Sequence, residues 1–167
     1  MTELLGSGDT LLQEAFRSAM GSVASAVAVV TTLSDGEPYG TTVSAFASLS
    51  MRPPMVLVSL GADSNLLARL VVGSMVGVNV LAADQDEVAV RFARRGGDKF
   101  AGVGWRIEDG APALAAKHAW ACVSVSRLVE AGDHTIVIGA VRVAEAYPGR
   151  PLTYWRSTFG THASAVI

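Results

Sequence analysis

The segment YGTTVSAFASLSMRPPMVLVSL, from Tyr39 to Leu60, decides how the chain folds. It reads as an antiparallel hairpin, because strand-forming runs lie on both sides of Arg52-Pro53-Pro54, where proline has no N–H to donate and stops the pairing. Its first half carries hardly any charge, and small hydroxyl residues stand where valine or isoleucine would pack better. These residues are Thr41, Thr42, Ser44, Ser48 and Ser50.

Strand patterns continue on both sides of this segment. Residues 27–33 are rich in β-branched side chains, Ser34-Asp35-Gly36 is a turn signal, and residues 39–48 are predicted to return as the paired strand. Residues 104–114, GWRIEDGAPAL, are predicted to form a loop. Further strands are predicted at 55–60, 75–82, 119–131 and 134–147, the last two joined by Gly132-Asp133.

An amphipathic helix is predicted at residues 10–20, where Thr10 and Gln13 have the spacing of a capping box. Its apolar residues recur at helical spacing and share one face. They are Leu11, Leu12, Ala15, Phe16 and Ala19.

Two shorter helices are predicted later in the chain. One covers residues 64–72 after a cap at Asp63 or Ser64, and the other covers residues 86–95, with Asp84 and Glu87 in capping-box register. Many strands with few short helices argue for an antiparallel barrel, since a doubly wound sheet needs strand–helix alternation throughout. We expect one mainly β domain over residues 1–167, with residues 1–9 as a flexible N-terminus.

Composition limits the possible partners and the compartment. Half of the 167 residues are apolar and 17% are charged, which is enough apolar side chain for a full hydrophobic core. The net charge of −2 gives no reason to expect nucleic acid or an anionic membrane as partner. The single cysteine, Cys122, allows no intrachain disulfide and fits a reducing cytoplasm. The N-terminus lacks the pattern of a signal peptide. We therefore expect a cytoplasmic protein.

Motifs for common cofactors are missing from the sequence. There is no P-loop and no G-x-S-x-G elbow, and the two G-x-G starts, at Gly6 and Gly102, do not complete a Rossmann fingerprint. His118, His134 and His162 lie far apart, so we expect no metal site.

Two patterns have both a structural and a functional interpretation. The hydroxyl residues after Tyr39 fit a strand that faces water, or a surface on which a flat ligand with a polar edge lies close to the backbone. The basic run Arg91, Arg94, Arg95 and Lys99 fits a helix C-terminus, where cations complement the dipole, or a phosphate contact.

Several segments, in order and at the expected spacing, resemble the short-chain flavin reductases, the reductase components of two-component flavin-dependent monooxygenases. The resemblance runs from about Phe16 to about Gly160. Its segments are VAVVTT and DGEPYGTTVSAFASLSMRPPMVLVSL, then SNLLARL, VGVNVLAADQ, RFA, DKFAGVGW, GDHTIVIGAV and PLTYWRSTFG. It implies a Greek-key split β-barrel with a few short flanking helices, which dimerises, binds FMN or FAD, and takes hydride from NADH or NADPH.

The resemblance also implies roles for individual residues. Thr42, Val43 and Ser44 match the segment that lines the isoalloxazine ring, and Thr41, Ala45 and Ser48 extend this site. Ser64 and Asn65 match the turn that holds the flavin phosphate, which is also a sensible anion site at a helix start. Arg91 and Phe92 lie where the family contacts the ribityl-phosphate or adenosine side, although a phenylalanine at helical spacing also fits the core.

The GDH segment and the C-terminal segment complete the expected site. Asp133 and His134 of GDH resemble the residues that meet the nicotinamide, with His134 as the catalytic residue, and the alternative is a strand-end histidine with a satisfied hydrogen bond. Tyr154 matches an aromatic residue near the ring, while Trp155 and Arg156 depart from the family pattern.

The implied function is an NAD(P)H:flavin oxidoreductase that supplies reduced flavin to a separate monooxygenase. Hydride transfer is carried by the cofactors, which accounts for the lack of a catalytic constellation in the sequence. Two alternatives stay open. One is a non-enzymatic split-barrel protein that binds flavin, haem or another tetrapyrrole, and the other is a flavin-dependent oxidase of the pyridoxamine-phosphate type. The GDH segment favours the reductase.

Overall fold

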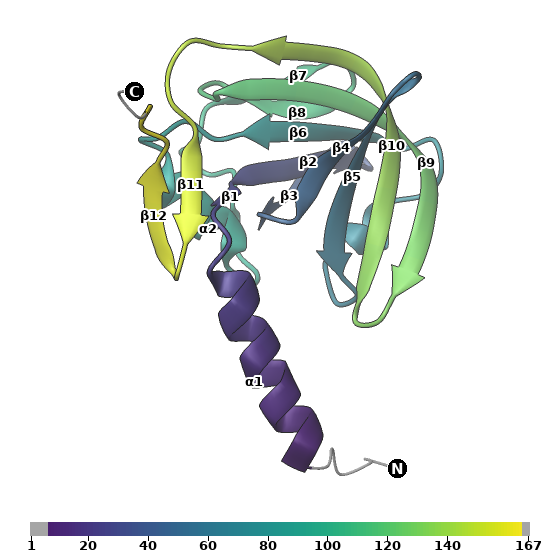
Figure 1. Cartoon of the computed structure of the whole chain (residues 1–167). Helices are drawn as coiled ribbons and strands as arrows, with labels where there is room; N and C mark the ends of the chain where they lie inside the picture. The colour runs from purple at the N-terminus through teal and green to yellow at the C-terminus, as the bar shows by residue number, and fades with distance from the viewer. Residues whose placement is uncertain (1–6, 165–167) are drawn as a thin grey trace.

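The computed structural model describes residues 7–164, and β-strands dominate them (Figure 1). The helices are α1 (Ser7–Gly21), the 3₁₀ helix η1 (Leu67–Arg69) and α2 (Asp86–Ala93). The strands are β1 (Ser25–Ala26), β2 (Ala28–Ser34), β3 (Glu37–Val43), β4 (Phe46–Met51), β5 (Pro54–Gly61), β6 (Met75–Val80), β7 (Trp105–Glu108), β8 (Ala111–Leu114), β9 (Ala119–Ala131), β10 (His134–Ala146), β11 (Leu152–Trp155) and β12 (Thr158–Thr161).

Seven of the strands form one antiparallel sheet in the order β3-β2-β6-β9-β10-β5-β4. Smaller sheets, β1-β11-β12 and β7-β8, flank it. Strands β9 and β10 are the long pair predicted at the end of the chain, and β10 pairs with β5 from His134↔Gly61 to Ala140↔Met55. The structure thus confirms the antiparallel, mainly β class.

The large sheet must curl, because its two edge strands follow each other in the sequence. Only Ser44 and Ala45 separate the end of β3 from the start of β4. In a flat sheet, six strand spacings would hold these edges roughly 29 Å apart, whereas the three Cα steps from Val43 to Phe46 span at most about 11 Å. The Ser59 N–H donates to the Ala45 carbonyl at 2.8 Å, which continues the β4–β5 pairing up to this corner.

The prediction of one return strand over residues 39–48 was therefore wrong. The run is two strands at opposite edges of the sheet, and Ser48 lies on β4, away from the residues of β3. Arg52-Pro53 does not stop pairing either. It is the turn of the β4–β5 hairpin, in which Met51 pairs with Pro54.

Residues 104–114 also differ from their prediction as a loop. They form the β7–β8 hairpin, in which Trp105 pairs with Leu114. The fully buried Asn79 side chain on β6 ties this hairpin to the sheet. Its carbonyl oxygen accepts the Leu114 N–H at 2.8 Å, and its amide donates to the Val29 carbonyl at 3.1 Å. The glycine and proline residues of this segment suggested a loop, but the contact with Asn79 stabilises a hairpin there.

Gly77 on β6 packs closely against Trp120, the largest of the fully buried side chains. A Cβ at Gly77 would lie 2.5 Å from Thr31 Oγ1 and 2.6 Å from an edge carbon of Trp120. Thr31 in turn donates to the Pro112 carbonyl at 2.6 Å. Since these neighbours are buried, only glycine fits on β6 here.

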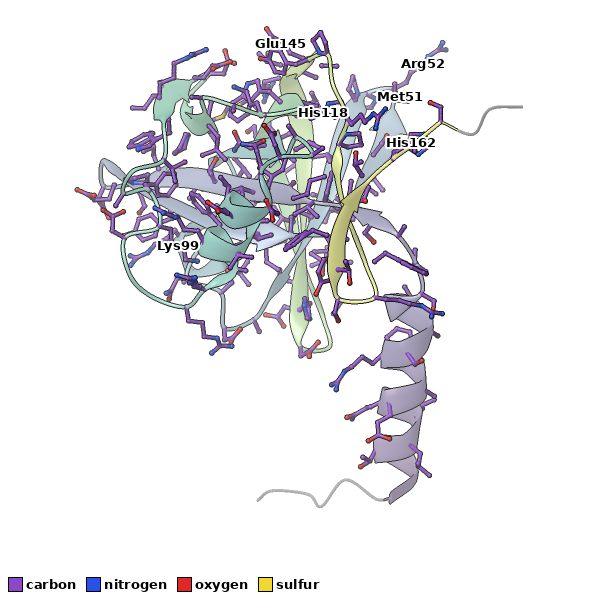
Figure 2. The ribbon with its side chains drawn as sticks, turned by 90° about the vertical axis from the view of Figure 1, so that its left-hand side faces the viewer. Met51, Arg52, Lys99, His118, Glu145 and His162 are labelled. Carbon is purple, nitrogen blue, oxygen red and sulfur yellow. The ribbon has the colours of Figure 1, made fainter. Side chains whose placement is uncertain are left out.

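Helix α1 projects from the body of the molecule (Figures 1 and 2). Thr10 lies inside the helix, so the predicted capping box at Thr10 and Gln13 was wrong. The predicted apolar face exists, yet Leu12 and Phe16 are 69% and 64% exposed. Of the expected flexible residues 1–9, residues 1–6 lie outside the described part and residues 7–9 belong to the first turn of α1.

The other helices are shorter than predicted. The Ser64 hydroxyl accepts the Leu67 N–H at 3.3 Å, as the predicted cap requires, but the helix that follows is the single 3₁₀ turn η1. Helix α2 starts after Gln85, which makes no side-chain cap, so Asp84 and Glu87 form no capping box. No helix within residues 7–164 has both the length and the apolar character needed to span a membrane.

Candidate functional site

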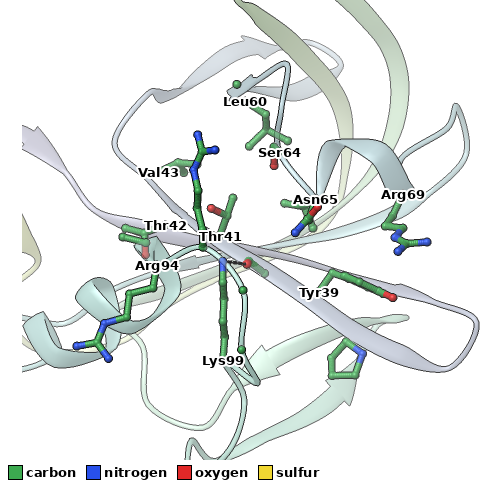
Figure 3. Close-up of a pocket in the computed structure, with 18 of the residues that line it drawn as sticks. Tyr39, Thr41, Thr42, Val43, Leu60, Ser64, Asn65, Arg69, Arg94 and Lys99 are labelled. Atoms are coloured by element: carbon green, nitrogen blue, oxygen red, sulfur yellow. Dashed lines mark hydrogen bonds between the residues drawn. The ribbon is translucent and has the colours of Figure 1, made fainter.

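A cavity of about 1170 Å³ opens where the two edges of the large sheet meet (Figure 3). This exceeds the roughly 300–1,000 Å³ of ordinary small-molecule sites. Its wall combines β3, the end of β5, the turn before η1 and the loop after α2. The lining residues are 37–45, 59–61, 63–66, Arg69, 93–101, Trp105 and His134.

Strand β3 forms the floor of the cavity, and its side chains alternate between two environments. Gly40 and Thr42 face α2, because the Thr42 hydroxyl donates to the Ala89 carbonyl at 2.6 Å and a Cβ at Gly40 would lie 2.8 Å from the Phe92 ring. Tyr39 and Thr41 lie on the opposite face of the strand. No hydrogen bond within the described residues uses the half-buried Thr41 hydroxyl, which lines the cavity.

The backbone of β3 also faces the cavity, because β3 is an edge strand with one unpaired side. The Gly40 carbonyl points to this side, where it accepts a hydrogen bond from Lys99. Thr42 is two residues further along, so its N–H and C=O point the same way. Peptide groups and the Thr41 hydroxyl thus line the cavity beside β3.

The loop after α2 supplies a basic wall. Lys99 donates to the Gly40 carbonyl at 3.1 Å and to the Phe92 carbonyl at 2.9 Å, and burial lowers the pKa of its ammonium group. The Asp98 carboxylate accepts the backbone N–H groups of Phe100 and Ala101 at 3.0 and 3.1 Å. These contacts fix the loop against β3, and Figure 3 shows Arg94 and Lys99 on this side of the cavity.

The opposite wall is the turn at Ser64 and Asn65, followed by η1. The Arg69 guanidinium at the end of η1 lies over the Tyr39 ring, 4.7 Å from its centroid. An exposed ion pair between Arg95 and Asp63 connects this wall to the basic wall. An exposed pair of this kind contributes only about 0–1 kcal/mol.

Positive charge exceeds negative charge around the cavity. Four cationic residues line it against three carboxylates. The cations are Arg69, Arg94, Arg95 and Lys99, and the carboxylates are Glu37, Asp63 and Asp98. Such a balance suits an anionic ligand.

His134 lies at the end of the cavity where β10 begins. It pairs with Gly61 of β5, and the Ala62 N–H donates to the Asp133 carbonyl at 2.9 Å, which fixes the β9–β10 turn against β5. The imidazole Nδ1 hydrogen-bonds the Asp133 carboxylate at 2.7 Å, and this bond lowers the pKa of the Asp133 carboxyl. The His134 side chain is 49% exposed, so a ligand can reach it.

The structure brings most of the predicted site residues together at the cavity. The residues that line the cavity are Thr41, Thr42, Val43, Ser44, Ala45, Ser64, Asn65 and His134.

The remaining predicted residues lie outside the cavity lining. The Ser48 hydroxyl on β4 faces the Met51 sulfur at 3.9 Å. Phe92 is fully buried and packs edge-on against Phe100, while Arg91 donates to the Ala101 carbonyl. Asp133 contacts the site only through His134.

Tyr154 also lies elsewhere, on β11 of the three-stranded sheet, where its ring packs against Phe159 with 5.1 Å between centroids. The Trp155 indole beside it donates to the Ser22 carbonyl at 3.0 Å, which ties β11 to the end of α1.

Sequence reasoning missed Tyr39 and Arg69 at one end of the cavity. No spacing rule connects residues thirty positions apart on a strand and a 3₁₀ turn. The basic run was noted, and the structure divides it, since Arg94, Arg95 and Lys99 line the cavity whereas Arg91 braces the loop. Within residues 7–164, no three His, Cys, Asp or Glu side chains gather closely enough to hold a metal ion.

Comparison with known proteins gives consistent matches. A family model described as "Flavin reductase like domain" matches residues 20–163. A "Flavin reductase (NADH)" of Kitasatospora aureofaciens is 42% identical over 161 residues, covering 93% of this chain and 82% of its own. The reductase component of a 4-nitrophenol 4-monooxygenase/4-nitrocatechol 2-monooxygenase of Rhodococcus opacus is 40% identical over 145 residues, covering 87% and 78%.

A solved structure agrees in fold. The NADH:FAD oxidoreductase of Streptomyces globisporus C-1027, in complex with NAD and FAD fragments, superposes with a TM-score of 0.85 at 34% identity, covering 97% of this chain and 98% of that one. The predicted family and its split-barrel fold are thereby confirmed.

The two neighbouring threonines of β3 should respond differently to substitution. Thr42→Val removes the buried hydrogen bond from the Thr42 hydroxyl to the Ala89 carbonyl, so we expect the free energy of unfolding to fall by about 1 kcal/mol. Thr41→Val removes no hydrogen bond within the described residues and should leave it unchanged. Urea unfolding monitored by circular dichroism makes the comparison, and equal losses in both variants would contradict this assignment.

Proposed function

This chain belongs to the flavin reductase-like domain family, and we propose that it is an NAD(P)H:flavin oxidoreductase that passes hydride from nicotinamide to FMN or FAD. The observation that carries the proposal is the cavity itself. It combines an open strand edge, a basic wall and an accessible histidine in one space. The relatives with the matching family domain are reductases, which favours this function over a non-enzymatic flavin or haem carrier and over an oxidase.

The residues present fit a flavin. An isoalloxazine ring has a flat apolar body and an edge of carbonyl and nitrogen atoms, which needs a close backbone and a few hydrogen-bonding groups. Strand β3 offers the unpaired peptide groups around Thr42 and the hydroxyl of Thr41. The Ser64 turn and the cations Arg94 and Lys99 offer contacts for phosphate.

The chemistry of hydride acceptance is supplied by the flavin when it is bound. The chain's own contribution is orientation. Lys99 and the Thr42 hydroxyl hold β3 against α2 and the loop that follows it, which makes the floor of the cavity rigid. A rigid floor matters because hydride transfer requires the nicotinamide and flavin rings to be stacked at a suitable distance and orientation.

His134 is the residue placed to meet the nicotinamide. Its imidazole stands half exposed at the cavity, and its Nδ1 is held by Asp133, so its other ring nitrogen is left for a ligand. In this proposal Asp133 positions His134 and does not itself touch the cofactor.

A separate monooxygenase is the proposed recipient of the reduced flavin. The Rhodococcus opacus relative is the reductase component of such a system. The open cavity of about 1170 Å³ suits a flavin that exchanges with solvent. The cytoplasm, which supplies NAD(P)H and keeps Cys122 reduced, is the proposed location.

The enzyme should oxidise NADH or NADPH only when FMN or FAD is supplied or retained. The check is loss of nicotinamide absorbance with each nucleotide, with and without each flavin, under anaerobic conditions with reduced flavin followed at the same time. Absence of flavin-dependent turnover with either nucleotide would refute the proposed function.

Replacing His134 by alanine should lower turnover with NAD(P)H by about tenfold while leaving flavin affinity near that of the wild type. The reason is that His134, half exposed at the start of β10, is proposed to meet the nicotinamide, whereas the groups proposed to hold the flavin belong to β3 and the Ser64 turn. Steady-state kinetics and flavin titration are measured together, with His162→Ala as the matched control on the exposed C-terminal segment. Wild-type kinetics would make His134 a structural residue of the β9–β10 turn.

A homodimer is also proposed, because no part of the chain within residues 7–164 covers the apolar face of α1. Leu11, Leu12 and Phe16 stay exposed on a helix that projects from the barrel, and a second copy of the same chain provides an equally apolar surface. We therefore expect a dimer by light scattering at micromolar concentration. Phe16→Glu should shift the mass toward the monomer, whereas Arg17→Glu, on the other side of the helix, should not. A monomeric wild-type protein would contradict the proposal.

A further inference from the structure

The cavity contains a second flat surface, on the side opposite Thr42 and Val43. It consists of Tyr39, in the first half of β3, and Arg69, at the end of η1, with the guanidinium 4.7 Å from the ring centroid. Figure 3 shows this pair on one side of the cavity, Thr42 and Val43 on the other, and Ser64 and Asn65 between them.

The Tyr39–Arg69 pair has one face available to a ligand. Tyr39 packs partly against the core, so Arg69 covers it from outside. Arg69 is exposed, and within residues 7–164 its guanidinium forms no ion pair or hydrogen bond with another side chain. A guanidinium plane held over an aromatic ring, with its outer face free, is a common stacking surface for nucleobases.

The length of the floor sets how much ligand the cavity holds. Residues 37–45 line it continuously, and their straight part, β3 (Glu37–Val43), extends over roughly 20 Å at about 3.3 Å per residue. The isoalloxazine site proposed at residues 41–45 takes the end of β3 and the corner after it, which leaves residues 37–40 for another part of the ligand. A mononucleotide flavin would end at the Ser64 turn and leave Tyr39 and Arg69 untouched.

The order of groups along the cavity matches a dinucleotide. A ring site at Thr42 to Ala45 is followed by the anion-binding turn at Ser64, and then by the stacking surface of Tyr39 and Arg69. We propose that the Tyr39–Arg69 pair binds the adenine of FAD, so that this enzyme binds FAD more tightly than FMN. This inference rests on the proposed flavin reductase function and names its flavin.

Arg69→Lys tests the stacking surface with charge retained. Lysine keeps the positive charge but has no planar group, so we expect FAD affinity to fall about tenfold, as loss of one base-stacking contact implies, and FMN affinity to stay unchanged. Both affinities are measured by quenching of flavin fluorescence in wild type and variant. Arg106→Lys, on β7 outside this cavity, is the matched control and should change neither.

A second variant protects the test against misfolding. Tyr39→Phe keeps the ring and should retain the wild-type preference, while Tyr39→Leu should lose it, with near-native circular dichroism required of both.

Kinetics with FMN as the flavin show whether the Tyr39–Arg69 pair binds the adenine of FAD or that of the nicotinamide nucleotide. If Arg69→Lys raises the KM for NADH in that assay and leaves FAD affinity unchanged, the surface serves the adenosine of the nicotinamide nucleotide and the inference is overturned. Equal wild-type affinities for FAD and FMN, or equal weakening of both by Arg69→Lys, would also overturn it. If the wild type binds neither flavin, the proposed function itself fails, which is a different result from loss of the FAD preference alone.

Discussion

Strands β3 and β4 are joined by only two residues, and this short connection shapes both the large sheet and the cavity. Ser44 and Ala45 must join the two edges of a seven-stranded sheet, and this is possible only if the sheet curls until its edges approach each other. The curl buries one face of the sheet as a core of valine and leucine side chains. The cavity lies beside this corner, with β3, the corner residues and the end of β5 in its lining.

The cavity takes its character from the same corner. Because β3 is an edge strand, half of its peptide groups are free, and small side chains let a ligand approach them. Pairing of His134 with Gly61 carries the β9–β10 turn to the same place. A hydrogen bond from Thr42 to α2 and two from Lys99 then fix the floor. Few side chains of the cavity are suited to take part in catalysis directly. This fits a reaction in which the two cofactors carry out the hydride transfer.

Much of the fold could be predicted because its signals are local. The β-branched run at 27–33, the turn at Asp35-Gly36 and the long strands around Gly132-Asp133 follow from side-chain periodicity and turn chemistry. The strands that were missed depend on distant partners. The β7–β8 hairpin is hydrogen-bonded to Asn79, and the break between β3 and β4 arises because these strands pair at opposite edges of the sheet. Neither feature can be seen in the pattern of the residues concerned.

The class of the protein and several residues that line the cavity could be inferred from the sequence alone, since the hydroxyl run, the Ser64 turn and His134 lie in segments that can be matched in order. The direction and surroundings of each side chain came from the tertiary structure. It turned the Thr42 hydroxyl toward Ala89, placed Ser48 on the opposite edge and enclosed Phe92 in the core. It also set Arg69 over Tyr39 and Lys99 against Gly40. The physical reason is that hydrogen bonding and stacking depend on the direction of a side chain in space. That direction is fixed by the curl of the sheet and not by position along the chain.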